Sequence, residues 1–176
     1  MKNNHVILQR MARIGVLAAL SLILVVVESF IPPLFAWAPG AKIGLGNIVI
    51  LLAIVTQGYP SALAILLIKC LFGAVYGGNM FGLVYSLSAG AASFAVMSLL
   101  YHFLNKRVSI VAISVVGAVV HNTVQTAIAA AVVSTMDYFA MLPFLLIASV
   151  IAGLVVGFCV YCVVRTVPVK VLIVRS

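Results

Sequence analysis

Long apolar runs separated by short polar breaks dominate the chain. The runs cover positions 14–31, 41–56, 61–76, 81–104, 109–134 and 143–164, and they are uniformly apolar. A transmembrane helix needs about 20 consecutive apolar residues, whereas a membrane β-barrel shows alternating segments of about 10 residues. The pattern therefore predicts six membrane-spanning helices, of which the second is short for a span.

The composition supports a membrane protein. Hydrophobic residues make up 66% and charged residues 7% of the 176 positions, whereas soluble domains carry about 25% charged residues. We expect an all-α integral membrane protein with one six-helix bundle over residues 14–164. A short lead (1–13) would precede this bundle and a basic tail (165–176) would follow it, both of them cytoplasmic.

The distribution of basic residues predicts the orientation of these spans in the membrane. Ten Lys and Arg residues against two acidic residues give a net charge of +8. Because the basic residues lie at the ends of apolar runs and form no single face, lipid contact and orientation explain them better than nucleic-acid binding. Six spans with both termini inside place eight of the ten on the cytoplasmic side, including Lys106 and Arg107. The expected location is the cell membrane.

The most unusual polar break is PGAKIGLGN at 39–47, which contains Lys42, Gly44, Gly46 and Asn47. Glycines allow a backbone to approach a ligand closely, and a helix that begins there directs free N–H groups outward. We expect the loop to lie on the outer face and to hold a phosphate, diphosphate or carboxylate. The alternative is a flexible surface loop. The chain has no GxxxxGK[ST] motif, so it does not bind ATP in that way.

Ionisable residues inside a membrane cost several kcal/mol unless they are paired or hydrated. Lys69 lies about midway along the third run, and Glu28 lies near the end of the first. Lys69 either pairs with Glu28 or backbone carbonyls and fixes the bundle, or faces a cavity and contacts an anionic ligand. Glu28 is the weaker candidate for a ligand contact, because it could reach the membrane interface.

A polar stripe runs along the fifth apolar segment. Gly117, His121 and Gln125 are spaced four residues apart and share one helix face, with Asn122 beside it. Such a stripe either forms interhelical hydrogen bonds or contacts a ligand. No second His or carboxylate has a spacing that suits a metal ion, so we expect no metal site and no cofactor.

Two further groups of small side chains need a role. Gly15 and Ala19 form a small-xxx-small pair in the first run, which could pack internally or contact a partner subunit. Cys70, Cys159 and Cys162 lie within apolar runs, where a disulfide framework is not indicated. The CxxC pair at 159 and 162 shares one helix face; packing explains it most simply, and a redox role stays open.

The motif PGAKIGLGN, the basic residue in the third run and VHNTVQ in the fifth resemble the Gx transporter family. That family is also labelled heptaprenyl diphosphate synthase component I and is similar to the S components of energy-coupling factor (ECF) transporters. The resemblance covers nearly the whole chain and implies a bacterial six-helix S-component fold with a substrate site near the outer face. It also implies that Gly15 and Ala19 take the place of the AxxxA motif that contacts the membrane coupling subunit.

These observations favour a substrate-binding subunit of an importer, whose ATPase and coupling subunits are separate chains. The small-molecule ligand would be anionic and partly apolar, such as an isoprenoid phosphate, a quinone precursor or a flavin-like molecule. The alternatives are an accessory subunit of prenyl diphosphate or quinone biosynthesis and a component of membrane electron transfer. Prenyl synthases bind Mg²⁺ through clustered aspartates, whereas this chain has one Asp and one Glu. We therefore expect no enzymatic activity.

Overall fold

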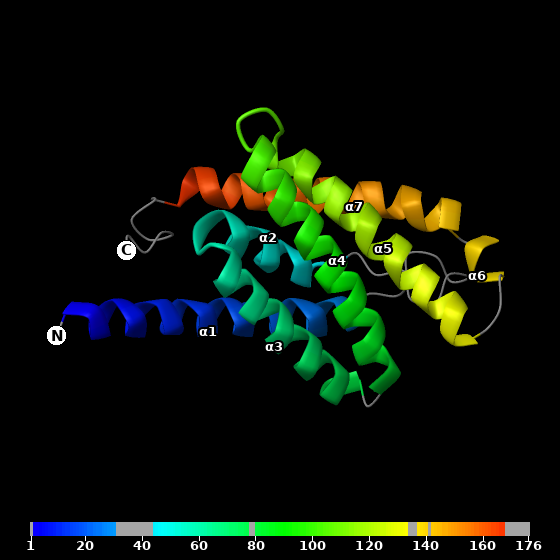
Figure 1. Ribbon diagram of the computed structural model, residues 1–176, viewed down its shortest axis with the longest axis horizontal. Coiled ribbons are helices and arrows are strands. Elements are labelled where there is room, and N and C mark those ends of the chain that lie inside the picture. Colours follow the sequence, from blue (N-terminus) through cyan, green and yellow to red (C-terminus); the bar gives the residue numbers. More distant parts are fainter. Residues whose placement is uncertain (1, 31–43, 78–79, 134–136, 141, 168–176) are drawn as a thin grey trace.

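The computed structural model describes residues 2–30, 44–77, 80–133, 137–140 and 142–167, and this part of the chain contains helices and no strands (Figure 1). This confirms the prediction of an all-α membrane bundle. The helices are α1 (Lys2–Ser29), α2 (Gly46–Thr56), α3 (Tyr59–Gly77), α4 (Met80–Leu104), α5 (Ile110–Val133), α6 (Asp137–Ala140) and α7 (Leu142–Thr166).

The second predicted span differs most from expectation. Among the described residues, 5 helices are long and apolar enough to cross a membrane, and α2 is not one of them. Its 11 residues extend only about 16 Å at 1.5 Å per residue, about half of a ~30 Å hydrocarbon core. Positions 41–43 of the predicted run lie outside the described residues. The described residues therefore form five full-length helices, the half-length α2 and the four-residue α6.

The position of α2 follows from its composition. Every residue from Val49 to Ile54 is buried, and α2 packs against α1, α3, α4 and α7. A helix that is apolar on all sides is stable when lipid or other helices surround it, and here the neighbouring helices do so. It ends at a turn where the N–H groups of Gln57 and Gly58 both donate to the Ala53 carbonyl, and Gly58 has a φ of +84°, a value that suits glycine.

The closest helix packing joins α5 and α7. A Cβ added at Gly153 would lie 2.6 Å from the Cα of Val115, and one at Gly157 would lie 2.7 Å from the Cα of Val111. Only glycine permits this separation of two backbones. The GLVVG sequence at 153–157 is a Gly-x-x-x-Gly pattern of the kind that joins membrane helices. The α5–α7 contact was not among the features predicted from the sequence.

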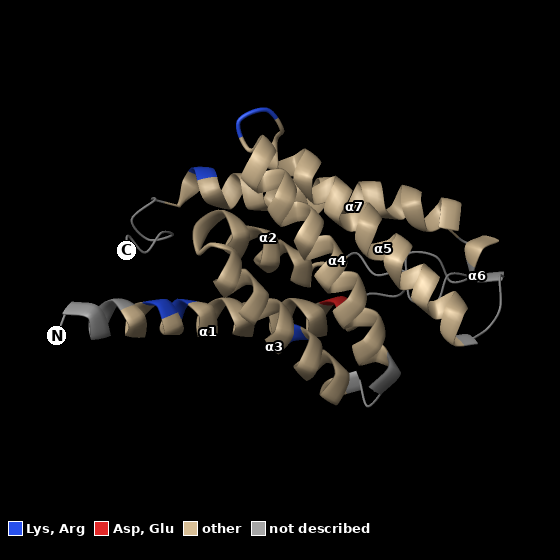
Figure 2. Ribbon diagram, in the orientation of Figure 1, with Lys and Arg blue, Asp and Glu red and all other residues tan. Residues whose placement is uncertain are grey.

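Apart from Lys69 on α3, the described basic residues gather toward one end of the bundle (Figure 2). Helix α1 begins at Lys2, so the lead expected before the first span is part of the same helix. The start of α1, the loop with Lys106 and Arg107, and the end of α7 lie toward the same end (Figures 1 and 2). Glu28 follows Arg13 by fifteen residues on α1, which is about 22 Å along a helix. The positive-inside rule predicts that Glu28 lies toward the outer face.

Candidate functional site

A cavity of about 390 Å³ lies where α2 begins, between the long helices. This volume is within the range of about 300–1,000 Å³ that is typical of small-molecule sites. Five of the lining positions are Gly, Ala or Val and most of the others are polar, so one site offers both kinds of contact. The lining residues are Val25, Glu28, Gly44, Asn47, Lys69, Gly82, Tyr85, Ser86, Ala118, His121, Asn122, Gln125 and Ala152.

The cavity brings together most of the residues singled out from the sequence. Those on its wall come from the start of α2, from α3 and from α5, namely Gly44, Asn47, Lys69, His121, Asn122 and Gln125. Gly46 is buried directly beside Lys69. Lys42 lies outside the described residues. The fold thus joins three motifs that the sequence separates widely.

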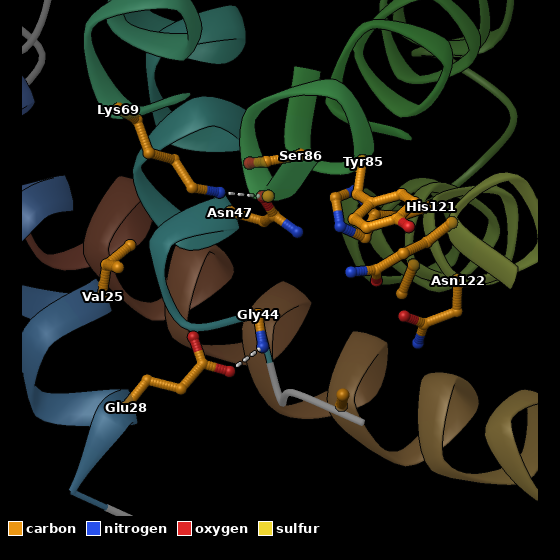
Figure 3. Close-up of a pocket in the computed structure, with 13 residues that line it drawn as sticks. Val25, Glu28, Gly44, Asn47, Lys69, Tyr85, Ser86, His121 and Asn122 are labelled. Atoms are coloured by element: carbon orange, nitrogen blue, oxygen red, sulfur yellow. Dashed lines mark hydrogen bonds between the residues drawn. The ribbon is translucent and has the colours of Figure 1, made fainter. Parts of the chain in front are cut away.

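Glu28 closes the N-terminal end of α2. Its carboxylate accepts hydrogen bonds from the backbone N–H groups of Gly44 and of Leu45, the latter at 3.1 Å (Figure 3). Gly44 and Leu45 directly precede α2, at the end of the helix that carries a positive partial charge, which a carboxylate compensates. Glu28 is 8% exposed, so it is a buried cap.

This cap corrects one expectation about the glycine-rich loop. We expected its backbone N–H groups to be free for a phosphate or carboxylate of a ligand. The amides of Gly44 and Leu45 instead bind the chain's own Glu28. The reason is that α2 begins inside the bundle, where an uncompensated helix terminus would be costly. These two N–H groups are therefore occupied, and residues 39–43 of the loop lie outside the described residues. Within the described residues, a ligand would use other donors.

Lys69 supplies such a donor. Its ammonium donates a 2.7 Å hydrogen bond to Oδ1 of Asn47, in the first turn of α2 (Figure 3). Gly46 makes room for the lysine, because a Cβ there would lie 2.8 Å from Cγ2 of Val25 and 3.0 Å from Cε of Lys69. The conformation of Gly44, with a φ of +77°, completes this turn. The loop glycines therefore position a cation at the cavity.

Helices α4 and α5 form the opposite wall (Figure 3). Asn122 lines the cavity and donates a 2.6 Å hydrogen bond to Oγ of Ser149 on α7, so the polar stripe supplies both interhelical contact and cavity surface. Nδ1 of His121 is buried and has no hydrogen-bond partner among the described residues. Oγ of Ser86 lies 3.4 Å from Sγ of Cys70. These side chains hold the wall in place and leave several polar groups facing the cavity.

Sequence reasoning missed Tyr85 and Ser86 as lining residues. Both lie inside a uniformly apolar run, where single hydroxyl groups are ordinary. A usable signal was the spacing of Gly82, Ser86 and Gly90, which places small residues on one face of α4 at intervals of four. Such a face leaves space beside a neighbouring helix.

Gly15 and Ala19 lie away from the cavity on an exposed face of α1. A Cβ added at Gly15 would meet nothing within 4 Å, so the internal-packing interpretation is wrong for this residue. Contact with a partner subunit stays a prediction. Cys159 and Cys162 are free thiols, partly buried on α7, and neither lines the cavity.

Apolar helices that enclose a ligand-sized polar cavity define a multi-pass membrane protein with a candidate binding site. The sequence matches the family described as heptaprenyl diphosphate synthase component I over residues 17–163, which is most of the chain. The chain therefore belongs to this family. The word "component" implies a partner subunit. No curated protein matches the chain.

Proposed function

We propose that this chain is the ligand-binding membrane subunit of an energy-coupled importer and captures a small molecule at the outer face of a bacterial cell membrane. The observation that carries the proposal is the cavity at the start of α2, with Lys69 on its wall. A lysine inside a membrane bundle is costly and rarely kept without a function. A cavity beside it gives that charge a ligand to bind.

The half-length helix supports a transport role. Membrane transporters place substrate sites at the ends of discontinuous helices, because irregular backbone at membrane depth must line a cavity or be buried in protein. Helix α2 begins beside Lys69, about midway along α3, and its first residues line the cavity. Glu28 on the cavity wall lies about 22 Å along α1 from Arg13, at 1.5 Å per residue, so the cavity is far from Arg10 and Arg13.

The charges on the wall narrow the class of ligand. Lys69 and Glu28 are the one lysine and the one carboxylate in the described lining, and their formal charges cancel. A diphosphate would bring several negative charges to a site whose described lining has one lysine, which is costly without more cations. A ligand with a single carboxylate or phosphate and an apolar part suits Lys69, Val25 and Ala152 better. Quinone precursors and flavin-like molecules fit this description better than prenyl diphosphates.

Energy for transport would come from partner chains. The sequence has no ATP-binding motif of the GxxxxGK[ST] type. Gly15 and Ala19 lie on an exposed, otherwise apolar face of α1 that includes Val16 and Leu20. Small residues on such a face allow another helix to approach closely, so this face is our proposed contact with a membrane coupling subunit.

The test begins with small molecules extracted from gently purified protein. Mass spectrometry should find a compound that is enriched in wild-type protein and lost from Lys69→Met, a variant of similar side-chain length. The control variant Lys106→Met removes a cation from an exposed loop and should retain the compound. Import of that compound in cells with and without the gene would then test transport. If both variants retain the same compounds, Lys69 does not bind a ligand.

A second function is favoured by the family description, which names a synthase component. The chain would then be an accessory subunit that holds a prenyl diphosphate synthase at the membrane, or that serves quinone biosynthesis. It would not catalyse the reaction itself, since its two acidic residues, Glu28 and Asp137, are far apart in the sequence. Co-purification with a soluble synthase, together with altered product length on deletion, would favour this function over import.

Membrane electron transfer is the remaining alternative, and it depends on Cys159 and Cys162. Both thiols lie on α7 outside the cavity. Serine at both positions should leave ligand binding unchanged if the chain is a binding subunit. Loss of a redox-dependent activity in that double variant would instead favour electron transfer.

A further inference from the structure

A second group of polar residues lies at the basic end of the bundle, far from the cavity. Arg10 and Arg13 are three residues apart on α1 and therefore on neighbouring positions of one face. Nε of Arg10 donates a 3.2 Å hydrogen bond to Oγ of Ser61, which is buried in the first turn of α3. Nη1 of Arg13 is buried without a hydrogen-bond partner among the described residues.

In the part of the chain that the structure describes, no Asp or Glu lies beside these arginines. The sequence contains two acidic residues, Glu28 and Asp137. Glu28 caps α2 and lies about 22 Å farther along α1, at 1.5 Å per residue. Helix α6 begins at Asp137 and lies at the opposite end of the molecule (Figure 1). Among the described residues these two cations therefore have no acidic partner, and an anion from outside the chain would neutralise them.

The surroundings of the two arginines indicate which anion this is. Large apolar side chains cover the exposed surface of α1 around them, with exposed fractions of 57% for Ile7, 66% for Leu8 and 65% for Met11. On the neighbouring helices, Tyr59 meets His102 edge-on at 6.2 Å between ring centroids. Cations beside apolar and aromatic side chains are typical of the membrane interface, where lipid headgroups and acyl chains meet.

We infer that Arg10 and Arg13, together with Ser61, bind the phosphate headgroup of an anionic phospholipid in the cytoplasmic leaflet. Guanidinium groups bind phosphate oxygens through paired, charge-assisted hydrogen bonds. The hydroxyl of Ser61 holds Arg10 beside the start of α3, and the apolar side chains of α1 contact the acyl chains. The bound lipid fixes α1 against the α2–α3 turn. This site is independent of the ligand cavity and of the proposed import.

Native mass spectrometry of the purified full-length protein tests the site. The protein is titrated with phosphatidylglycerol and with phosphatidylcholine of the same acyl chains. We expect retention of phosphatidylglycerol over phosphatidylcholine, and we expect Arg10→Gln and Arg13→Gln each to lower that affinity about fivefold, the usual contribution of one basic residue near an anionic membrane. The double variant Arg10→Gln/Arg13→Gln has a matched control, Lys106→Gln/Arg107→Gln, which removes the same charge from an exposed loop at the same end and should change the affinity much less.

Three results would overturn the inference. The first is equal binding of both lipids by wild-type protein, and the second is an equal loss in the two double variants, which would indicate general electrostatics. The third is complete displacement of the lipid by inorganic phosphate, which would indicate a free-anion site. If the variant at Arg13 fails to fold, Arg10→Gln alone decides the test, because Arg10 is exposed and thermal melting can confirm its fold.

Discussion

The α5–α7 contact and the start of α2 are two ways to join helices in one membrane bundle. Along α5–α7, Gly153 and Gly157 bring backbones so close that an added Cβ would lie 2.6 or 2.7 Å from a Cα. At the start of α2, the chain leaves a cavity of about 390 Å³ and surrounds it with polar groups. The α5–α7 contact leaves no space for a ligand. At the start of α2 the helices are farther apart, and hydrogen bonds of polar side chains connect them around the cavity.

The difference follows from helix length. Helices α5 and α7 each have enough residues to cross a membrane and can pack along their whole length, where small residues give close van der Waals contact. Helix α2 fills about half of that distance, so its first turn ends inside the bundle and needs polar partners. Glu28 and Lys69 supply those partners. The cavity and the charged side chains beside it, Glu28 and Lys69, thus have one common cause.

The largest expected loss of stability comes from a substitution in the α5–α7 contact. Gly153→Leu places a side chain where the Val115 backbone lies, and backbone cannot yield as a flexible side chain does. We expect a loss of about 3 kcal/mol in stability, at the upper end of typical overpacking costs. Thermal melting in detergent measures this loss. Gly73→Leu is the matched control, because a Cβ at Gly73 meets nothing within 4 Å; equal melting of the two variants would refute the close contact.

A smaller loss of stability is expected from a substitution at the start of α2. Glu28→Gln removes the charge of the cap and leaves one acceptor oxygen for the two N–H groups of Gly44 and Leu45. We expect a loss of about 2 kcal/mol, the scale of a buried hydrogen bond to a charged group. Hydrogen exchange at Gly44 and Leu45 should become faster, while exchange in α5 should not change. Unchanged protection at both amides would show that the carboxylate is not the cap.

The smallest expected contribution to stability is that of the hydrogen bond between Asn122 and Ser149. This bond connects the wall of the cavity to α7. A double-mutant cycle with Asn122→Ala and Ser149→Ala should give a coupling energy of about 0.6 kcal/mol, the average for interhelical hydrogen bonds in membranes. Unfolding measurements on the four proteins supply this value. A coupling near zero would mean that Asn122 serves the cavity alone.

The sequence was a good guide to the long helices, because each apolar run is bounded by turn-forming or charged residues. The helices α3, α4, α5 and α7 begin and end within about two residues of the predicted runs. The short second run already suggested something unusual at 41–56. Sequence alone could not show that α2 is buried on all sides, since apolar residues face lipid and protein equally well.

The site residues could be predicted where a polar side chain is costly inside a membrane helix. They could not be predicted where the side chain is common in such helices. Lys69 and the stripe with His121 and Gln125 stand out in apolar runs, and all three line the cavity. The role of Glu28 could not be predicted, because its partners are backbone N–H groups. The fold places these groups beside the carboxylate only where α2 begins at Gly46. Tyr85 and Ser86 gave no comparable signal, since hydroxyl groups are inexpensive in membrane helices.

The central claim is that Lys69 binds a ligand in the cavity at the start of α2. Native mass spectrometry of the intact protein, titrated with the compound that co-purifies with it, tests this claim most directly. We predict one bound molecule per chain and a loss of affinity of about 10- to 100-fold in Lys69→Met, which corresponds to one hydrogen bond to a charged group. Lys106→Met should bind as wild-type protein does. Equal affinity of Lys69→Met and wild-type protein would contradict the claim.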